Sequence, residues 1–544
     1  MGTTAFVNGT VFDGHRYLGR ADVLVDDGKV VEVAPRGLVT GLRPSSTNGT
    51  VDLAGGLISP GFTDAHVHPI QGGLERLRCD LSELATREEY LAEIRAYADR
   101  FPDREWVLGG GWAMPAFPGG TPTAADLDAV VPERPVFLPN RDHHGAWVNS
   151  RAMEIAGLDA STPDPPDGRI ERDVDGRPSG TLHEGATALV SRYLPRTSGE
   201  DYYAALMEGQ RYLHSLGVTS WQDAIVGAYS GMDDPGATYA KAAANGDLRS
   251  HVVGALWWER RLGVEQVADL VGRREALSGG RLQARAIKVM QDGVAENGTA
   301  AMLTPYLDVD GRETANRGHS FVEADALREA VAALDAAGFQ VHVHAIGDRA
   351  SREALDAFEG TSPDRRHHIA HIQVVHPDDV PRFASLGVAA NAQALWACED
   401  EQMSELTLPF LGPERAAWQY PFGDLNRAGA RLVMGSDWPV STPDPLQAMH
   451  VAVTRTAYGE RAGSSGPFLP GQAVDLETAY AAYTSGSAWI NRRDELDGAG
   501  VLAPGAAADL VVLDRDPFAG PPEEIGATRV LSTWIDGEAV YTGG

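Results

Sequence analysis

The chain has 544 residues and carries 76 acidic against 46 basic side chains, a formal net charge of -30. This balance argues against nucleic acid as a partner, because phosphate binding needs clustered lysine and arginine, and it disfavours an anionic membrane surface. No apolar run approaches the ~20 residues of a membrane span, and the first residues lack the pattern of a secretory signal. With only Cys79 and Cys398, no disulfide framework is expected. We therefore expect a cytoplasmic protein without nucleic-acid or membrane partners.

The two ends of the chain share a β-rich character. Residues 4–35 contain short β-prone runs separated by Asn-Gly and Asp-Gly turns, which favour hairpins. From about Val501 onward the pattern returns in the runs ADLVVLDRD and RVLSTWIDGEAVYTGG. Because end segments of one type can pair with each other, we predict that residues 1–57 and 496–544 together form a small composite β-sandwich domain.

Between the two ends, helices alternate with short apolar strands. The segment EADALREAVAALDAAG has the apolar spacing of a helix and ends at Gly338, and FQVHVHAIGD, which follows, is typical of a strand. The same alternation recurs at RRHHIAHIQVV and ARLVMGSDWP. It predicts a parallel sheet or barrel in an α/β fold. A stretch rich in Pro and Gly, from about 80 to 200, interrupts the alternation and is interpreted as an insertion.

Histidines at the end of an apolar run indicate a metal site. In PGFTDAHVHP, His66 and His68 lie two residues apart, so in a strand both imidazoles would point to one face and could share a metal. Alone, the pair is equally compatible with two ordinary histidines of the core or of a loop. In a (β/α)8 barrel the carboxyl ends of the strands form the active-site rim. Further polar residues fall at such ends: Lys288 in RAIKVMQDG, His344 in FQVHVH, His371 in HIAHIQ and Asp437 in RLVMGSD.

The order and strand-end positions of these six residues resemble those of the metal-dependent amidohydrolase superfamily. Local motifs resemble its amidohydrolase family 3 branch, within which the chain is most similar to the N-substituted formamide deformylases and their relatives. The resemblance covers nearly the whole chain and implies a TIM-like (β/α)8 barrel over residues 58–495. The motifs that carry it are SPGFTDAHVHP, GGGW at 109–112, HGAWVNSRAMEIAG at 144–157, GTLHE at 180–184, KVMQDGVAENGTAAMLTPY at 288–306, HAIGDRA at 344–350 and GSDWPVS at 435–441.

The resemblance implies a site for two divalent metal ions, most often zinc, that share a hydroxide. This bridging hydroxide would attack the carbonyl of a small neutral amide, such as an N-substituted formamide. Asp437 would take the proton and pass it to the leaving nitrogen, as general base and then acid. Lys288 would bridge the metals as a carbamate, because carbon dioxide converts a repelling ammonium group into an anionic oxygen ligand. The implied ligands are His66, His68 and Asp437 for the first metal, and His344 and His371 for the second.

Some of these residues have alternative interpretations. From spacing alone, Lys288 is better read as an ordinary lysine paired with Asp292, and only the resemblance favours the carbamate. His342 shares a strand face with His344, yet the family motif begins at His344, so we expect His342 to be a core residue or to support a ligand rather than to bind metal. Asp64 is likewise expected to orient a histidine.

Three residues are candidates for contact with the substrate. Trp112 and His144 match motif positions that would reach the site from the insertion, whereas Trp438 directly follows Asp437 and would narrow the pocket. A buried tryptophan more often packs than binds, so packing is the alternative for Trp112. Glu184 is left without a role. The expected partner is a small-molecule amide, and a homodimer is left open.

Two classes of function follow from these residues. The leading class is hydrolysis of a carbon–nitrogen bond, and the same site could cleave cyclic imides, esters or lactones. The other class is a catalytically silent scaffold that keeps the barrel. Loss of ligand residues would mark such a scaffold, and all six are present. The fold by itself does not select a substrate.

Overall fold

A parallel barrel forms the centre of the molecule. The computed structural model describes residues 2–35, 37, 47–229, 231–459 and 466–543. Within them, eight parallel strands form a sheet in the order β19-β18-β17-β16-β15-β14-β13-β6. Just beyond β19, the backbone N–H of Asp437 donates to the His66 carbonyl on β6 (2.7 Å), so the two edge strands meet and the barrel is nearly closed. The strands are β6 (Phe62–Val67), β13 (Val218–Val226), β14 (His251–Trp257), β15 (Leu282–Met290), β16 (Gln340–Ala345), β17 (His368–His371), β18 (Ala389–Ala392) and β19 (Leu432–Met434).

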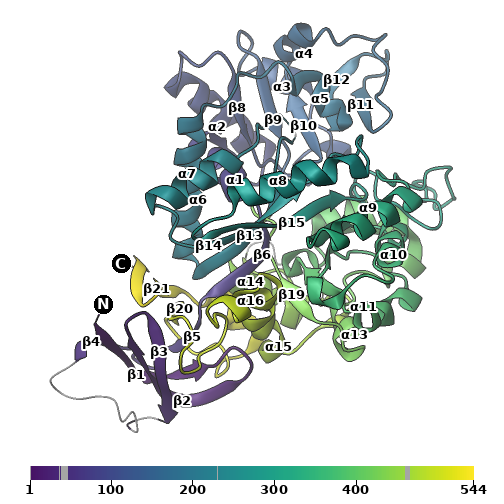
Figure 1. Ribbon diagram of the computed structural model, residues 1–544. Coiled ribbons are helices and arrows are strands. Elements are labelled where there is room, and N and C mark those ends of the chain that lie inside the picture. The colour runs from purple at the N-terminus through teal and green to yellow at the C-terminus, as the bar shows by residue number, and fades with distance from the viewer. Residues whose placement is uncertain (1, 36, 38–46, 230, 460–465, 544) are drawn as a thin grey trace.

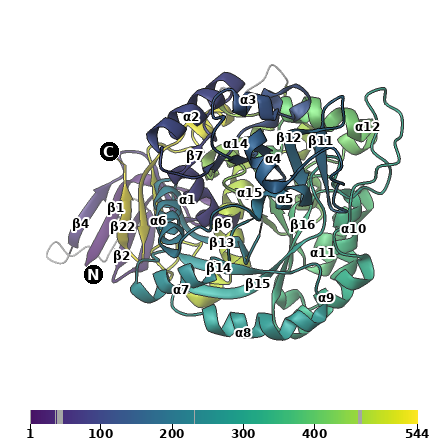
Figure 2. The ribbon, with the colours of Figure 1, turned by 90° about the horizontal axis from the view of Figure 1, so that it is seen from above.

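Helices surround this barrel and connect its strands (Figure 1, Figure 2). On the helix at residues 324–336, Leu327, Val331 and Leu334 are buried in the main core, and these are the apolar positions that predicted a helix. None of the described helices combines the length and the apolar character of a transmembrane span. The barrel helices are α6 (Gly199–Ser215), α7 (Gly236–Asn245), α8 (Val267–Leu277), α9 (Ala324–Ala336), α10 (Asp348–Ala357), α11 (Val380–Leu386), α13 (Phe422–Arg427) and α14 (Pro445–Thr454).

A second sheet is built by the chain between β6 and β13, and it lies above the barrel in the view of Figure 1. Its strand order is β11-β12-β10-β9-β8-β7. It has a core of its own, in which the rings of Trp112, Phe117 and Trp147 pack edge to face. The strands are β7 (Cys79–Asp80), β8 (Val107–Gly110), β9 (Val136–Pro139), β10 (Gly145–Val148), β11 (Gly168–Arg172) and β12 (Pro178–Glu184).

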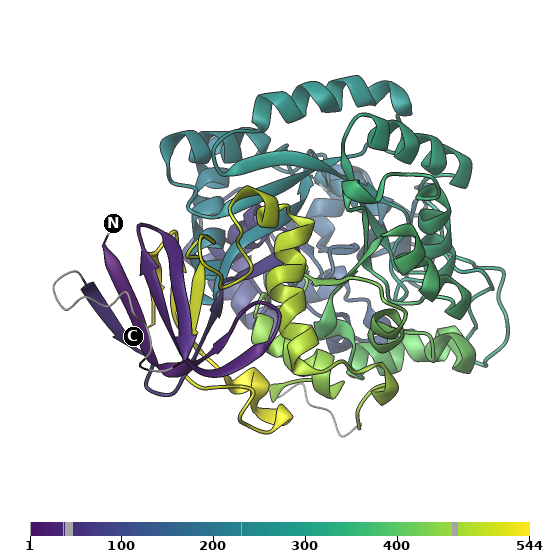
Figure 3. The ribbon, with the colours of Figure 1, turned by 60° about the horizontal axis from the view of Figure 1, so that its bottom comes forward.

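Both chain ends contribute to a third sheet beside the barrel (Figure 3). Its order is β22-β21-β20-β5-β1-β2-β3, and β4 also pairs with β1. Two strands separate β1 from β21 in this order, yet the rings of Phe6 and Trp534 lie 5.2 Å apart, so the sheet bends over its apolar core. The strands are β1 (Thr3–Phe12), β2 (Tyr17–Asp26), β3 (Lys29–Pro35), β4 (Thr47–Asp52), β5 (Leu57–Pro60), β20 (Leu510–Leu513), β21 (Val530–Ile535) and β22 (Glu538–Thr542).

The predicted α/β fold is confirmed at the level of a nearly closed parallel barrel. Pairing of the two chain ends is also observed, because β5 lies between β1 and β20 in one sheet. The description of this part as a sandwich is not confirmed. The boundaries at residues 57 and 495 and the insertion limits stay predictions. Residues 36 and 38–46 of the predicted N-terminal part lie outside the described residues.

The helix that follows the first barrel strand, α1 (Pro69–Leu77), packs closely on α6 through glycines. A Cβ atom added at Gly73 would lie 1.9 Å from the carbonyl oxygen of Ala205, and one at Gly209 would lie 2.3 Å from that of Pro69. Only glycine permits this approach of two helix backbones. The contact matters for function because α1 begins directly after His68.

We predict that Gly73→Ala destabilises the protein by ~1–3 kcal/mol, because the added methyl group forces α1 and α6 apart. Gly199→Ala, at the start of α6, is the matched control, since no heavy atom lies within 4 Å of its added Cβ. Thermal and urea unfolding of both variants would measure the effect. Equal stability of the two variants would contradict the close packing of these helices.

Candidate active site

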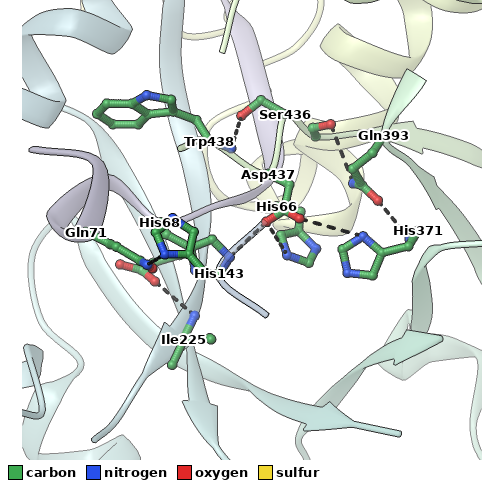
Figure 4. Close-up of polar contacts among 12 residues, drawn as sticks. His66, His68, Gln71, His143, Ile225, His371, Gln393, Ser436, Asp437 and Trp438 are labelled. Carbon is green, nitrogen blue, oxygen red and sulfur yellow. Dashed lines mark hydrogen bonds and ion pairs between the residues drawn. The ribbon is translucent and has the colours of Figure 1, made fainter. Parts of the chain in front are cut away.

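The carboxyl ends of the barrel strands bring all six predicted ligand residues to one cavity. Its volume is about 510 Å³, part of it open to solvent. Figure 4 shows several of these side chains turned toward one another around Asp437. Because parallel strands end at the same rim, side chains far apart in sequence converge there. His66 lies on β6, Lys288 on β15, His344 on β16 and His371 on β17, while His68 follows β6 and Asp437 follows β19.

The carboxylate of Asp437 is the centre of this arrangement. Its Oδ1 lies 2.9 Å from Nε2 of His68 and 3.2 Å from Nε2 of His66, and its Oδ2 lies 3.8 Å from Nδ1 of His371. Burial alone would raise the pKa of Asp437, but the neighbouring imidazoles hold this pKa well below its ordinary value. Asp437 is therefore a buried anion, which makes it an available metal ligand.

Three of the ligand histidines, His66, His344 and His371, are held in their neutral form. Burial lowers the pKa of His66 to about 3, and it lowers the pKa values of His344 and His371 well below the ordinary value. A neutral imidazole carries the lone pair that binds a metal ion, whereas a protonated one does not. The electrostatic state of these side chains thus suits metal ligands.

The donor atoms present fit a divalent metal ion. Ligand atoms of His66, His371 and Asp437 all lie within 4.8 Å of one another. Nδ1 of His371 is buried and, among the described residues, has no hydrogen-bond partner. Nε2 of His344 lies 3.2 Å from the Gly293 carbonyl oxygen, which leaves its Nδ1 for a ligand. Imidazole nitrogen and carboxylate oxygen together are typical ligands of zinc.

Lys288 lies at the wall of the same cavity without a carboxylate partner among the described residues. Its Nζ is 3.3 Å from Nε2 of His66, and burial lowers the pKa of Lys288 to about 7. Asp292, the partner in the alternative interpretation, instead accepts backbone N–H groups of Ala301, Ile346 and Gly347 at 2.8–3.0 Å. The pairing of Lys288 with Asp292 is therefore absent, and the lysine faces the histidines.

Of the two residues considered as supports for the ligands, His342 contacts a ligand ring and Asp64 contacts the backbone and a hydroxyl group. Nε2 of His342 lies 3.0 Å from Nδ1 of His66, so His342 fixes the ring of this ligand. Asp64 instead accepts hydrogen bonds from the backbone N–H of His66 and from the backbone and hydroxyl of Ser436 (2.6–3.0 Å). It therefore holds together the ends of the first and last barrel strands.

The three predicted substrate residues are placed differently. His144 lines the cavity, with its ring 5.8 Å from that of His344. Trp112 and Trp438 are not among the residues that line the cavity. Trp112 is buried in the core of the insertion and donates from Nε1 to the Leu138 carbonyl (2.8 Å), as its packing alternative predicted. Figure 4 shows the indole of Trp438 directed away from Asp437, and this ring packs on Tyr212.

Sequence reasoning missed the neighbour of His144. His143 also lines the cavity, and its left-handed backbone (φ 63°) separates the direction of its side chain from that of His144. Nε2 of His143 lies 3.1 Å from Oε1 of Glu75, and its Nδ1 lies 2.8 Å from Nε2 of Gln71. The adjacent histidines in RDHHGAW were the available signal, but the residues that meet His143 are on α1, far away in sequence.

His144 forms a buried ion pair with Glu184, the acid left without a role above. Nδ1 of His144 lies 2.9 Å from Oε2 of Glu184. Burial alone would lower the pKa of His144, but the Glu184 carboxylate raises it to about 9. The pKa of Glu184 falls below its ordinary value despite burial, because of the same imidazole. One wall of the cavity therefore carries a protonated histidine, opposite neutral ones.

Comparisons with known proteins place the chain in a family. The profile of the amidohydrolase family matches residues 49–541. The chain belongs to this family. The resemblance predicted from the motifs is thereby confirmed, and family membership supports hydrolase activity.

Individual relatives of this family extend over nearly the whole chain. YtcJ of Bacillus subtilis is 30% identical over 90% of each chain. The N-substituted formamide deformylase of Arthrobacter pascens is 28% identical over 95% of this chain and 94% of that protein. An uncharacterized metal-dependent hydrolase from Pyrococcus horikoshii OT3 superposes with a TM-score of 0.72 at 25% identity, over 96% of this chain and 99% of that one.

We predict a pH dependence of stability from the His144–Glu184 pair. Between about pH 4.5 and 6.5, the ordinary pKa values of the two groups, both side chains are charged in the folded and the unfolded states, so the pair contributes fully. As the pH rises from 6.5 toward 9, the unfolded histidine loses its proton while the folded one keeps it, and the contribution falls. Urea unfolding of metal-free wild type and Glu184→Gln should therefore differ most near pH 6 and least above pH 9. A difference that does not change across this range would contradict the pair.

Proposed function

We propose that the protein hydrolyses the carbon–nitrogen bond of a small amide, of the N-substituted formamide type. It uses two divalent metal ions, for which zinc is the leading candidate. The observation that carries this proposal is the convergence of His66, His371 and Asp437 in one cavity. The similarity to a protein named N-substituted formamide deformylase supports the substrate class. His66, His68 and Asp437 would hold one ion, and His344 and His371 the other.

Lys288 would complete the ligand set as a carbamate. Its buried amine has a pKa lowered to about 7, so a large share of it is unprotonated at neutral pH. The free amine forms a bond from Nζ to the carbon of carbon dioxide and releases one proton, which yields an anionic carbamate. The cavity then gains the negative charge that offsets two dications among neutral histidines.

Asp437 and His144 have separate roles in the proposed reaction. When bound, the two ions polarise the amide carbonyl and lower the pKa of water, as in other two-metal hydrolytic sites. Asp437 accepts a proton from the water whose oxygen attacks the carbonyl carbon, and it delivers this proton to the nitrogen as the carbon–nitrogen bond breaks. His144, kept protonated by Glu184, faces the same cavity and would donate a hydrogen bond to the substrate.

The first experiment joins metal analysis of protein purified without chelator to hydrolysis assays. The assay panel contains N-substituted formamides, acyl amides, cyclic imides and lactones. We expect about two zinc equivalents per chain and cleavage of amides. Cleavage restricted to imides or lactones would replace the substrate class. Absence of metal after addition of zinc and bicarbonate would favour the silent scaffold.

We predict that Asp437→Asn lowers turnover at least ~10²-fold while folding and metal content stay largely intact, because the amide cannot accept the proton. Asp444→Asn is the control. Asp444 caps α14 by accepting the backbone N–H groups of Leu446 and Gln447, a task that asparagine performs equally well. Steady-state kinetics and metal analysis of both variants test this role. Near-normal turnover of Asp437→Asn would remove Asp437 from the reaction.

The carbamate can be detected directly, because the chain contains only three lysines, Lys29, Lys241 and Lys288. We predict a carbamate signal in the ¹³C NMR spectrum of zinc-loaded protein prepared with ¹³C-bicarbonate. Lys288→Met should lose the signal and at least one of about two zinc ions, because the bridging ligand is gone. Lys29→Met and Lys241→Met should keep both. A signal that survives in Lys288→Met would assign the carbamate elsewhere.

A further inference from the structure

A second cavity lies beside the metal cavity, between α1 and the insertion. It has a volume of about 670 Å³, part of it open to solvent. Its walls are mainly apolar and come from α1, from the insertion, from the segment before α6 and from the loop after β13. Among the lining residues are Leu74, Leu108, Phe137, Pro139, Leu194 and Met232.

This side cavity adjoins the metal cavity. Gln71, His143 and Tyr229 line both of them. Gln71 and His143 are hydrogen-bonded to each other at 2.8 Å, so only a layer of side chains separates the two spaces. A substrate whose amide lies at the ligands of the barrel rim would therefore extend its substituent past this pair into the side cavity.

One cation lines the side cavity. Arg78, directly after α1, is half-buried and donates from Nη2 to the Thr197 hydroxyl at 2.8 Å. In the part of the chain that the structure describes, no carboxylate lies within ion-pair distance of its guanidinium. Nearby Asp201 is bound to Ser198 at the start of α6 instead. A guanidinium with one neutral partner in an apolar cavity is suited to bind an anion.

Glu75, an acid on α1, does not cancel this charge. Glu75, one turn before Arg78, lines the same cavity but contacts His143 at 3.1 Å. Burial raises the pKa of Glu75 well above its ordinary value and lowers the pKa of His143 to about 3. The two side chains therefore form a neutral pair, and Arg78 remains the net charge of the cavity wall.

We infer that the side cavity binds the substituent of the substrate, and that this substituent is an apolar chain or ring ending in a carboxylate that pairs with Arg78. The inference rests on the proposed amide hydrolysis for the bond that is cut, and it adds the chemical class of the rest of the molecule. The scissile amide is neutral, whereas the whole substrate is an anion. In a chain with a net charge of -30, capture of such an anion requires a local cation, which Arg78 supplies.

The test measures binding without turnover. Methanesulfonamides of ω-amino acids, in a series of chain lengths, are compared with their neutral carboxamide counterparts by calorimetric titration of the zinc-loaded protein. The sulfonamide group resists hydrolysis, so the ligands stay intact. We expect the best carboxylate to bind ~10- to 100-fold more tightly than its carboxamide, the range for a hydrogen-bonded ion pair.

Variants of Arg78 test whether the preference for carboxylates over carboxamides comes from pairing with this arginine. Arg78→Met should abolish the preference, and Arg78→Lys should keep part of it. Arg76→Met, two residues earlier, is the matched control, because Arg76 pairs with Glu208 (2.9 Å) and lies over the ring of Tyr212 instead of lining the cavity. It should keep the full preference.

Three results would overturn the inference. The first is equal binding of carboxylates and carboxamides to wild type, and the second is that none of these ligands binds. The third is a preference that persists in Arg78→Met, which would place the carboxylate on the metal ions. The first two results overturn the inference from wild type alone, even if a variant does not fold. The hydrolysis panel separates this inference from the proposed function. If the preference depends on Arg78 but no amide is cleaved, the inferred role of the side cavity stands and the proposed hydrolysis is rejected. If amides are cleaved but the preference is absent, the proposed hydrolysis stands and the inferred role of the side cavity is rejected.

Discussion

A carboxylate buried away from water must be compensated, and in this protein the compensation of Asp437 organises the whole site. Its oxygens lie against the imidazoles of His66, His68 and His371, at 2.9–3.8 Å. Its backbone N–H also donates to the His66 carbonyl and brings the first and last barrel strands together. An unpaired buried charge would be strongly destabilising. Asp437 thus contributes both to the closure of the barrel and to the assembly of the ligand set.

A second layer of buried acids stabilises the rim through backbone amides. Asp64 joins the ends of β6 and β19, and Asp292 accepts three N–H groups from the loops after β15 and β16. Because these carboxylates bind the backbone, they fix the direction of the strand ends instead of competing for the ligand atoms. His342 in turn fixes the ring of His66. The ligands are consequently held in place before any metal binds.

The insertion gives the cavity its second electrostatic wall. The barrel presents neutral histidines, whereas the insertion presents His144, protonated through its contact with Glu184. The adjacent His143 turns the other way and forms a neutral pair with Glu75 on α1, beside the side cavity that contains Arg78. Of these two neighbouring residues of one loop, His144 lines the metal cavity alone, whereas His143 lines both cavities. Under the proposed function, the barrel determines the reaction, and the insertion and α1 determine what is recognised.

The sequence by itself determined the alternation of strands and helices, the β-rich ends and the strand-end positions of the six ligand candidates, because these depend on local periodicity and spacing. Only the tertiary structure decided which neighbours each side chain meets. Trp112 and Trp438 belong to the motifs that carry the family resemblance, yet their rings pack away from the cavity. Glu75 and Arg78 carry no local signal, and the adjacent histidines of RDHHGAW do not show what His143 meets, since these contacts follow from the packing of α1 between the barrel and the insertion. Spacing along the chain fixes the face of a strand, but contacts between distant segments depend on how the helices and sheets pack.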